Sequence, residues 1–385
     1  MDNTERLENR ADYIANNISL WELSTVASIA KKLGNIGKLT DEEIKQFDVE
    51  KEAEKEWKRA VSAFSGIVVL NIKSLKRIYT DEMNDWHEAN KPLYDYRGVR
   101  FVDVNDNPDF QAIINSFSKE NAKNITQTSA LYVIDKNDNV IRLKDMIYKA
   151  FSEAVEVVST GKGDFYSVMR DTVQKLGGSG VRVDYGGGVT RRLDTVTRQN
   201  MLWGVKQAHK EYNDLVGQQL NTDGIEIDYH ANARPSHRFM QGKQYAKGEA
   251  KTVNGVYYPS AEKSGVYERL YDDYNCYHYE TDIILGVSEP RYTEEELKRF
   301  IEKDQRLYKI GDIEKDGYGW GQSMRHLETE IRRAKDEINA LEAFGNSEAE
   351  IKLLKERIKA YKTKYTEISQ ITGIAEQPQK MSVTK

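Results

Sequence analysis

The C-terminal third of the chain carries two apolar seams that predict a pair of packed helices. The first seam steps alternately by four and three residues, at Leu327, Ile331, Ala334, Ile338 and Leu341. The second seam follows the same spacing, at Ile351, Leu354, Ile358, Tyr361, Tyr365 and Ile368. Such spacing places the apolar side chains on one stripe of an α-helix. Because only a few residues separate the seams, the two helices must fold back as an antiparallel hairpin.

The link between the seams contains signals for a helix end and a helix start. Gly345 and Asn346 favour the left-handed conformation that ends a helix, and Ser347 to Glu350 matches a capping box. So thin a hairpin buries little core by itself, so we expect it to dock either on the body of the protein or on a neighbouring protein. The candidate docking residues are Leu327, Ile331, Arg332, Leu354, Ile358 and Tyr361.

The first 125 residues have the spacing of helices interrupted by polar turns. Thr40 to Glu43 is a second capping-box match, in which a hydroxyl and a carboxylate each accept a hydrogen bond from a backbone amide at the helix start. Pro92 and Pro108 predict breaks, because proline disfavours the helical conformation in the residue before it.

The middle of the chain predicts short strands and tight turns. Residues 130–135 and 140–143 flank an Asn-Asp-Asn turn, and they predict either a β-hairpin or a helix pair. Gly186 to Gly188 lack the pattern of a P-loop or of a dinucleotide fold, so they predict a turn with positive φ and not a phosphate cradle. We expect the neighbouring Arg191 and Arg192 to be solvated.

These patterns together predict an α+β protein that is predominantly helical. A small central mixed domain holds the short strands, and the antiparallel helical hairpin follows it. The predicted division is a mainly helical N-terminal region at 1–150, a central α+β domain at 151–300, the hairpin at 301–372 and a disordered tail at 373–385.

Composition narrows the classes of function. The 57 basic and 62 acidic residues give a net charge of −5, which argues against a dedicated binder of duplex DNA. A single cysteine, Cys276, excludes an internal disulfide and suits a reducing cytoplasm. The longest apolar run, residues 66–70, is far shorter than a membrane span, and no secretion signal opens the sequence. We therefore expect a soluble protein that is made in the cytoplasm.

A polar stretch at residues 228–245 follows a predicted strand at residues 224–229. It holds two histidines and several cations, which is the minimum for metal-free RNA cleavage. An RNase-like or toxin-like enzyme that uses His230, His237 and Arg234 is therefore one hypothesis. The favoured interpretation is structural: Arg234 and His237 fix an irregular loop whose turns are set by Pro235 and Gly242. No catalytic residue is predicted under that interpretation, and the protein is not expected to be an enzyme.

A second cluster of reactive side chains lies further along the chain. Cys276 and His278 are two residues apart, so in a strand they lie on one face. Together with His230 and His237 they supply the four ligands of a tetrahedral zinc site. This structural zinc is the one candidate cofactor. The thiol is also a candidate nucleophile beside His278, and a buried structural cysteine remains an equal alternative.

Several blocks of the chain, in order, resemble the phage minor capsid protein 2 family, which is related to the head morphogenesis proteins of Mu-like and other tailed phages. The family's ARPSH and QG..Y block is matched by Ala233, Arg234, Pro235, Ser236, His237, Gln241, Gly242 and Tyr245. Residues 275–278, which begin at Asn275, resemble its NCRH motif, with Tyr277 in place of the arginine. Residues 325–335 are similar to its C-terminal hairpin. Met240 stands where the family commonly has tryptophan.

The resemblance implies a structural minor capsid protein of a tailed phage. Such a protein is incorporated in few copies in the head, in its interior or at the portal vertex, after assembly in the host cytoplasm. It assists head assembly and DNA packaging or delivery. The implied partners are the portal protein, the major capsid protein or both, together with packaged DNA and without any membrane.

Overall fold

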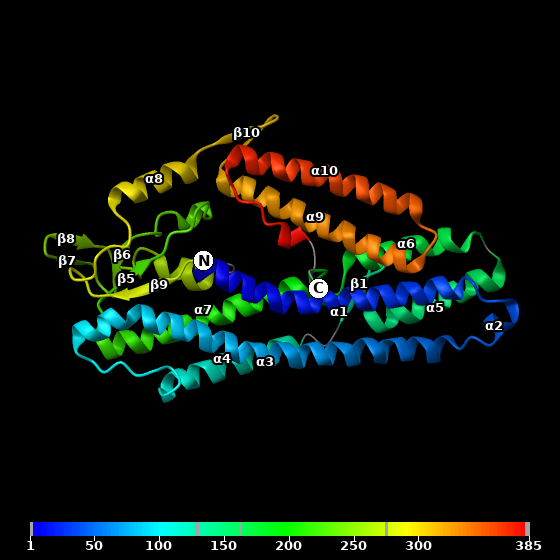
Figure 1. Ribbon diagram of the computed structural model, residues 1–385, viewed down its shortest axis with the longest axis horizontal. Coiled ribbons are helices and arrows are strands. Elements are labelled where there is room, and N and C mark those ends of the chain that lie inside the picture. Colours follow the sequence, from blue (N-terminus) through cyan, green and yellow to red (C-terminus); the bar gives the residue numbers. More distant parts are fainter. Residues whose placement is uncertain (1–2, 128–130, 162, 274–275, 382–385) are drawn as a thin grey trace. The chain divides into compact units, whose positions relative to one another are not determined.

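The computed structural model describes residues 3–127, 131–161, 163–273 and 276–381, and these form a predominantly helical α+β protein, as predicted (Figure 1). The helices are α1 (Asn3–Ile36), α2 (Asp41–Lys45), α3 (Val49–Arg97), α4 (Pro108–Gln127), α5 (Leu143–Thr160), α6 (Phe165–Ser179), α7 (Leu193–Leu220), α8 (Glu294–Gln305), α9 (Gly317–Phe344) and α10 (Glu348–Thr372). The strands are β1 (Tyr132–Ile134), β2 (Val140–Arg142), β3 (Arg182–Asp184), β4 (Thr190–Arg192), β5 (Gly224–Ile227), β6 (Gln244–Ala246), β7 (Lys251–Val253), β8 (Val256–Tyr258), β9 (Glu280–Ile283), β10 (Tyr308–Ile310) and β11 (Ile313–Lys315). Shorter helical turns are η1 (Pro235–His237), η2 (Glu268–Asp272) and η3 (Pro378–Met381).

The chain forms two compact units, and each is assembled from stretches that are distant in sequence. Unit 1 consists of Met1–Arg10, Ile72–Ala122 and Gln199–Gln322. Unit 2 consists of Ala11–Asn71, Lys123–Arg198 and Ser323–Lys385. Long helices such as α3 contribute residues to both units. The sequence predicts consecutive domains at 1–150, 151–300 and 301–372. Whether these segments fold independently stays a prediction.

Unit 2 contains a four-stranded antiparallel sheet with the strand order β2-β1-β3-β4. Residues 131–143 form a β-hairpin and not a helix pair, which settles the alternative left open by the sequence. The same hairpin-then-helix module recurs 50 residues later, from β1 at 132 to β3 at 182 and from α5 at 143 to α7 at 193. The two modules join where Tyr132 pairs with Arg182.

The glycines between β3 and β4 form the predicted turn. Gly186, Gly187 and Gly188 all have positive φ, at 80°, 61° and 80°. This conformation costs little only for glycine, because glycine has no Cβ. No Cβ built at these positions meets another atom within 4 Å, so the run serves chain reversal and not close packing.

Helices α9 and α10 form the predicted antiparallel hairpin in unit 2 (Figure 1). Gly345 and Asn346 end α9 with φ values of 90° and 50°. The predicted capping box at Ser347 is wrong, because the Ser347 hydroxyl donates to the carbonyl of Gly345 at 3.0 Å and does not cap α10. The Tyr365 hydroxyl of α10 donates to Glu328 of α9 at 2.7 Å, which ties the two helices together.

Helix α9 packs on the body of unit 2. The α-carbon of Gly34 in α1 lies so near Phe344 that a Cβ there would overlap the Phe344 carbonyl oxygen. Gly177 in α6 makes a similarly close approach to Ala340. Of the predicted docking residues, Leu327, Ile331 and Leu354 are buried, at 6%, 0% and 2% exposure, and Ile358 and Tyr361 are partly exposed. The first seam therefore packs in the core of the protein itself. Of the two alternatives, docking on the protein's own body or on a neighbouring protein, it follows the former.

A largely buried ion-pair cluster overturns the expectation that Arg192 is solvated. Its guanidinium donates to Glu22 at 2.6 Å and to Asp336 at 3.0 Å, and it lies 3.6 Å from Asp194. Arg332, predicted to dock on a partner, instead lies 3.6 Å from the other oxygen of Asp194. Residues from four separate helices or strands meet here, so no local pattern could have signalled the cluster. Of the adjacent pair Arg191 and Arg192, Arg191 is the exposed one, as expected.

The two prolines in the N-terminal half behave differently. Pro108 begins α4, and the Asn107 side chain accepts hydrogen bonds from the amides of Asp109 and Phe110. The break predicted at Pro92 is wrong, because α3 continues through it to Arg97. Proline removes one helical hydrogen bond at this position. The loss is tolerated near the end of the helix, where the neighbouring Tyr94 is 2% exposed and packs in the core.

The C-terminal segment is ordered further than the sequence predicts. After α10 ends at Gly373, the amide of Gln377 donates to the Tyr365 hydroxyl at 2.8 Å, and η3 follows. Met381 is 5% exposed and thus anchors the segment. The predicted disordered tail is therefore wrong for residues 373–381, and residues 382–385 lie outside the described part of the chain.

Unit 1 combines helices with a three-stranded antiparallel sheet of order β6-β5-β9 and two small hairpins, β7–β8 and β10–β11. Its helical part packs around an aromatic cluster of Trp86, His87, Phe110, His209 and Tyr212. Strand β5 is buried along all four residues, because the sheet and its coverings enclose both faces. Within the described residues, every helix is too short or too polar to cross a bilayer.

Candidate functional site

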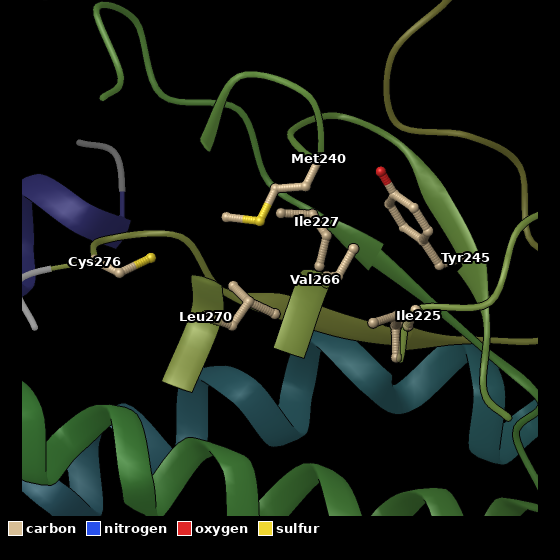
Figure 2. Packing of buried hydrophobic residues seen from close by; sticks show 8 residues of the cluster. Ile225, Ile227, Met240, Tyr245, Val266, Leu270 and Cys276 are labelled. Atoms are coloured by element: carbon tan, nitrogen blue, oxygen red, sulfur yellow. The ribbon is translucent and has the colours of Figure 1, made fainter. Parts of the chain in front are cut away.

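The polar stretch after β5 lies on a small hydrophobic core in unit 1. Ile225 and Ile227 of β5 pack with Met240 and Tyr245, and Cys276 lies at the edge of the same cluster (Figure 2). The sequence expected Tyr229 to continue this strand, but β5 ends at Ile227. The chain then enters the loop of residues 228–243, which carries most of the candidate side chains.

Buried contacts fix the shape of this loop. Asp304 of α8 accepts hydrogen bonds from the Asn232 amide at 2.9 Å and from the Tyr229 hydroxyl at 3.0 Å. Gly242 has φ of 72°, and a Cβ there would overlap Leu297, so both its conformation and its position require glycine. The Tyr245 hydroxyl donates to the Phe239 carbonyl at 3.3 Å.

His237 closes a short 3₁₀ turn that begins at Pro235, and it points at a carboxylate. Its Nε2 lies 2.7 Å from Asp273, and His237 is 2% exposed. Arg269 donates to the same carboxylate at 3.3 Å, while Arg234 lies 3.8 Å away at the surface. Since a carboxylate accepts hydrogen bonds, His237 carries its proton on Nε2 and leaves Nδ1 for another contact.

Cys276 and His278 lie directly before β9 and meet His237. Ligand atoms of the three side chains all lie within 4.8 Å of one another, and all three residues are buried. The Cys276 Sγ is 3.6 Å from His278 Nδ1, and His278 Nε2 is 3.0 Å from the side-chain oxygen of Gln241. The Gln241 oxygen also accepts from the His230 amide at 3.2 Å, and its nitrogen faces Asp304 at 3.4 Å. These contacts fix the orientation of the amide, so His278 carries its proton on Nε2.

His230 stands beside this triangle of His237, Cys276 and His278 and outside it. Its ring centroid is 4.9 Å from that of His278, but its Nε2 lies 3.0 Å from Asp228. Asp228 also accepts a hydrogen bond from the Tyr279 amide at 2.8 Å. The structure thus brings three of the four predicted metal ligands together and holds the fourth on a carboxylate.

Burial and neighbouring charges set the protonation of the site. Burial lowers the pKa of His278 to about 3, so this imidazole is neutral near neutral pH. Burial alone would raise the pKa of the Cys276 thiol, but the hydrogen bond from His237 and the charge of Lys206 outweigh it and lower the pKa. The Lys206 ammonium donates to the Cys276 carbonyl at 3.1 Å. The neutral imidazole of His278 therefore faces a thiol whose pKa is lowered.

The geometry does not favour the enzyme hypothesis of His230, His237 and Arg234. The two imidazoles are held by different carboxylates, Asp228 and Asp273, and His237 is shielded from solvent. A cavity of about 20 Å³ lies beside Cys276 and Lys206, which is room for roughly one water. A nucleotide does not fit that space.

Sequence reasoning selected the side chains that meet but missed the residues that orient them. Asp228, Asp273 and Lys206 have no role in the predicted site, because acidic and basic residues are common and nothing local marks these. Ser236 is exposed on the 3₁₀ turn, and Asn275 falls outside the described residues. The roles predicted for the loop residues and for the metal ligands stay predictions.

A comparison with protein families decides the classification. The profile for phage minor capsid protein 2 matches residues 5–368, nearly the whole chain. The chain belongs to the phage minor capsid protein 2 family. Membership supports a structural role in the phage capsid, a place in the virion and contact with other head proteins. No curated protein matches the chain significantly, and no solved structure does. The phage minor capsid protein 2 match includes stretches of both units, so the family signature is not confined to one of them.

Proposed function

We propose that this minor capsid protein is a low-copy component at the portal vertex of the phage head, where it assists head assembly and DNA packaging or delivery. The family match across residues 5–368 carries the proposal. Its partners are the portal protein, the major capsid protein or both, together with packaged DNA. The protein is made and incorporated in the host cytoplasm before the head is complete.

The outward face of α10 supports a role in contact. Helix α10 buries Leu354, Tyr365, Ile368 and Thr372, whereas Leu353 is 63% exposed and Ile371 45% exposed. The exposed basic residues of this helix are Lys352, Lys355, Arg357, Lys359, Lys362 and Lys364. Lys355, Lys359 and Lys362 share one face of α10 with the partly exposed Ile358. This basic face suits an acidic groove on a neighbouring protein or the phosphates of DNA.

Incorporation into heads tests this proposal. Purified virions and procapsids are expected to contain the protein in few copies relative to the major capsid protein, by quantitative mass spectrometry. The triple variant Lys355→Glu/Lys359→Glu/Lys362→Glu is expected to reduce the copies per head at least about tenfold, because it reverses the charge of the contact face. A matched control, Lys55→Glu/Lys73→Glu/Lys76→Glu, changes the same charge on exposed positions of α3.

Surface charge reversal is a sharper test than removal of the hairpin. Deleting residues 321–372 also removes Ile331 and Phe344, which are buried in unit 2, so loss of incorporation would only report misfolding. Normal incorporation of the α10 variant would contradict α10 as the contact face. Absence of the wild-type protein from purified particles would overturn the proposed place in the head.

A further inference from the structure

The search for further function leads to the triangle of His237, Cys276 and His278 in unit 1. We propose that these three side chains bind one zinc ion, with Nδ1 of His237, Sγ of Cys276 and Nδ1 of His278 as ligands and water in the fourth position. The site differs from the four-ligand set that the sequence predicts, because His230 is held by Asp228 and does not belong to the triangle. This proposal is independent of where the protein sits in the head.

The distances suit a tetrahedral ion. Zinc binds sulfur at about 2.3 Å and histidine nitrogen at about 2.0–2.1 Å, so two such ligands at a tetrahedral angle lie about 3.6 Å apart. The observed distance between Cys276 Sγ and His278 Nδ1 is 3.6 Å. The remaining ligand atoms lie within 4.8 Å, so small side-chain rotations suffice to complete the set.

The hydrogen bonds around the triangle prepare both imidazoles to bind a metal. A metal-bound histidine almost always donates its other ring N–H to a carboxylate or a carbonyl oxygen, which fixes the ring and its tautomer. His237 donates its Nε2–H to Asp273, and His278 donates its Nε2–H to the Gln241 oxygen. Because an oxygen acceptor holds Nε2 of each ring, Nδ1 of each ring is left as the ligand atom.

The choice of zinc follows from the ligands and the compartment. Imidazole nitrogen and thiolate sulfur together suit a borderline-soft ion, and zinc accepts a tetrahedral set without redox chemistry. Hard ions such as magnesium and calcium prefer oxygen ligands. When bound, the ion would link His237 at the end of the η1 turn to Cys276 and His278 just before β9.

Metal analysis of the full-length protein, purified without a polyhistidine tag, tests the site. About one zinc ion per chain is expected, and it should return after chelator treatment when zinc is added back. Cys276→Ser and His278→Asn should lose the metal. The controls His230→Asn and His326→Asn, the latter at an exposed position on α9, should keep it. Zinc retained by Cys276→Ser, or lost from His230→Asn, would overturn the three-ligand assignment.

A spectroscopic measurement on the wild-type chain avoids the risk that a variant misfolds. Cobalt bound in place of zinc gives a sulfur-to-metal charge-transfer band only when a thiolate is a ligand, and Cys276 is the single cysteine of the chain. That band should appear and saturate at about one equivalent of cobalt. Failure of the metal-free wild-type protein to bind zinc or cobalt, or binding without the band, would refute the proposal.

Discussion

Each unit of this minor capsid protein contains a buried polar cluster, and the two clusters are held together by different means. In unit 2, Arg192 meets Glu22, Asp194 and Asp336, so opposite charges compensate one another. In unit 1, the buried residues His237, Cys276 and His278 place their ligand atoms within 4.8 Å of one another. The first cluster joins ions of opposite sign, whereas the second joins imidazole and thiol groups, which are metal ligands.

The difference shows what burial demands of polar groups. Removing charges from water is costly, so a buried ion pair persists only where several partners compensate it. Burial, with Asp194 and Asp336 nearby, raises the pKa of Glu22 to about 7 although Arg192 opposes the shift. Imidazoles instead become neutral on burial and remain available as ligands. A cluster of opposite charges therefore supports a fold, whereas a cluster of imidazole and thiol groups is suited to bind a metal ion.

The largest expected effect comes from removing the central cation of unit 2. Arg192→Met leaves three buried carboxyl groups without their partner and should destabilise unit 2 by about 3–5 kcal/mol. Urea unfolding followed by circular dichroism measures the change. The adjacent Arg191→Met is the control, since Arg191 is exposed, and should cost less than about 0.5 kcal/mol. Equal effects of the two substitutions would mean that the ion cluster is not a structural centre.

The next prediction tests the close packing of α9 against α1 in unit 2. Gly34→Ala places a Cβ against the Phe344 carbonyl and should cost about 1–3 kcal/mol through overpacking between α1 and α9. Gly66→Ala in α3 meets nothing within 4 Å and should be stabilising by about 0.5–1 kcal/mol. Thermal unfolding of both variants gives the comparison, and a stable Gly34→Ala protein would contradict the close contact.

Acid should weaken unit 1 through its neutral imidazoles. Burial lowers the pKa of His209 to about 3 from an ordinary value of 6.5. The unfolded chain takes up a proton below about pH 6.5 and the folded chain does not, so the stability from this residue is complete above that pH. It is lost as the pH falls towards 3, at up to about 1.4 kcal/mol per pH unit. In metal-free protein, His209→Gln should flatten this slope in urea unfolding followed by tryptophan fluorescence. An unchanged slope would contradict the neutral state of His209.

The smallest effect separates a capping box that forms from one that does not. Thr40→Ala removes the hydroxyl that accepts from the Glu43 amide and should cost about 1 kcal/mol. Ser347→Ala should change stability by less than about 0.5 kcal/mol, because Ser347 does not cap α10. Both positions lie in unit 2, so the same urea unfolding measures them. A larger loss for Ser347→Ala would show that the cap forms in solution.

The features that the sequence predicted correctly are those that depend on local pattern. The seams of α9 and α10, the glycine turn at 186–188 and the break at Pro108 all follow from spacing or from the backbone preferences of single residues. One wrong prediction, the capping box at Ser347, fails locally, because its hydroxyl donates to the Gly345 carbonyl. Other wrong predictions concern residues whose state depends on distant partners. Arg192, Pro92 and Met381 are decided by packing against segments far away in the chain, which a single sequence does not reveal.

The candidate site divides in the same way. The chemistry of Cys276 and His278 was visible from their spacing, and His237 from the density of polar residues around it. The exclusion of His230 depends on Asp228, whose carboxylate lies two residues away and competes for the imidazole. Sequence can propose ligands by type, but the contacts that orient each ring decide which of them converge.

The interleaved order of the two units governs how this chain folds during synthesis. Unit 2 needs Ala11–Asn71 and also Ser323–Lys385, which leave the ribosome after all the other stretches. The helices of unit 2 that are made early must therefore wait, with part of their apolar surface uncovered, until Ser323–Lys385 has been synthesised. The close contact of Gly34 with Phe344 forms only then, so a chain cut short before Ser323 cannot complete unit 2.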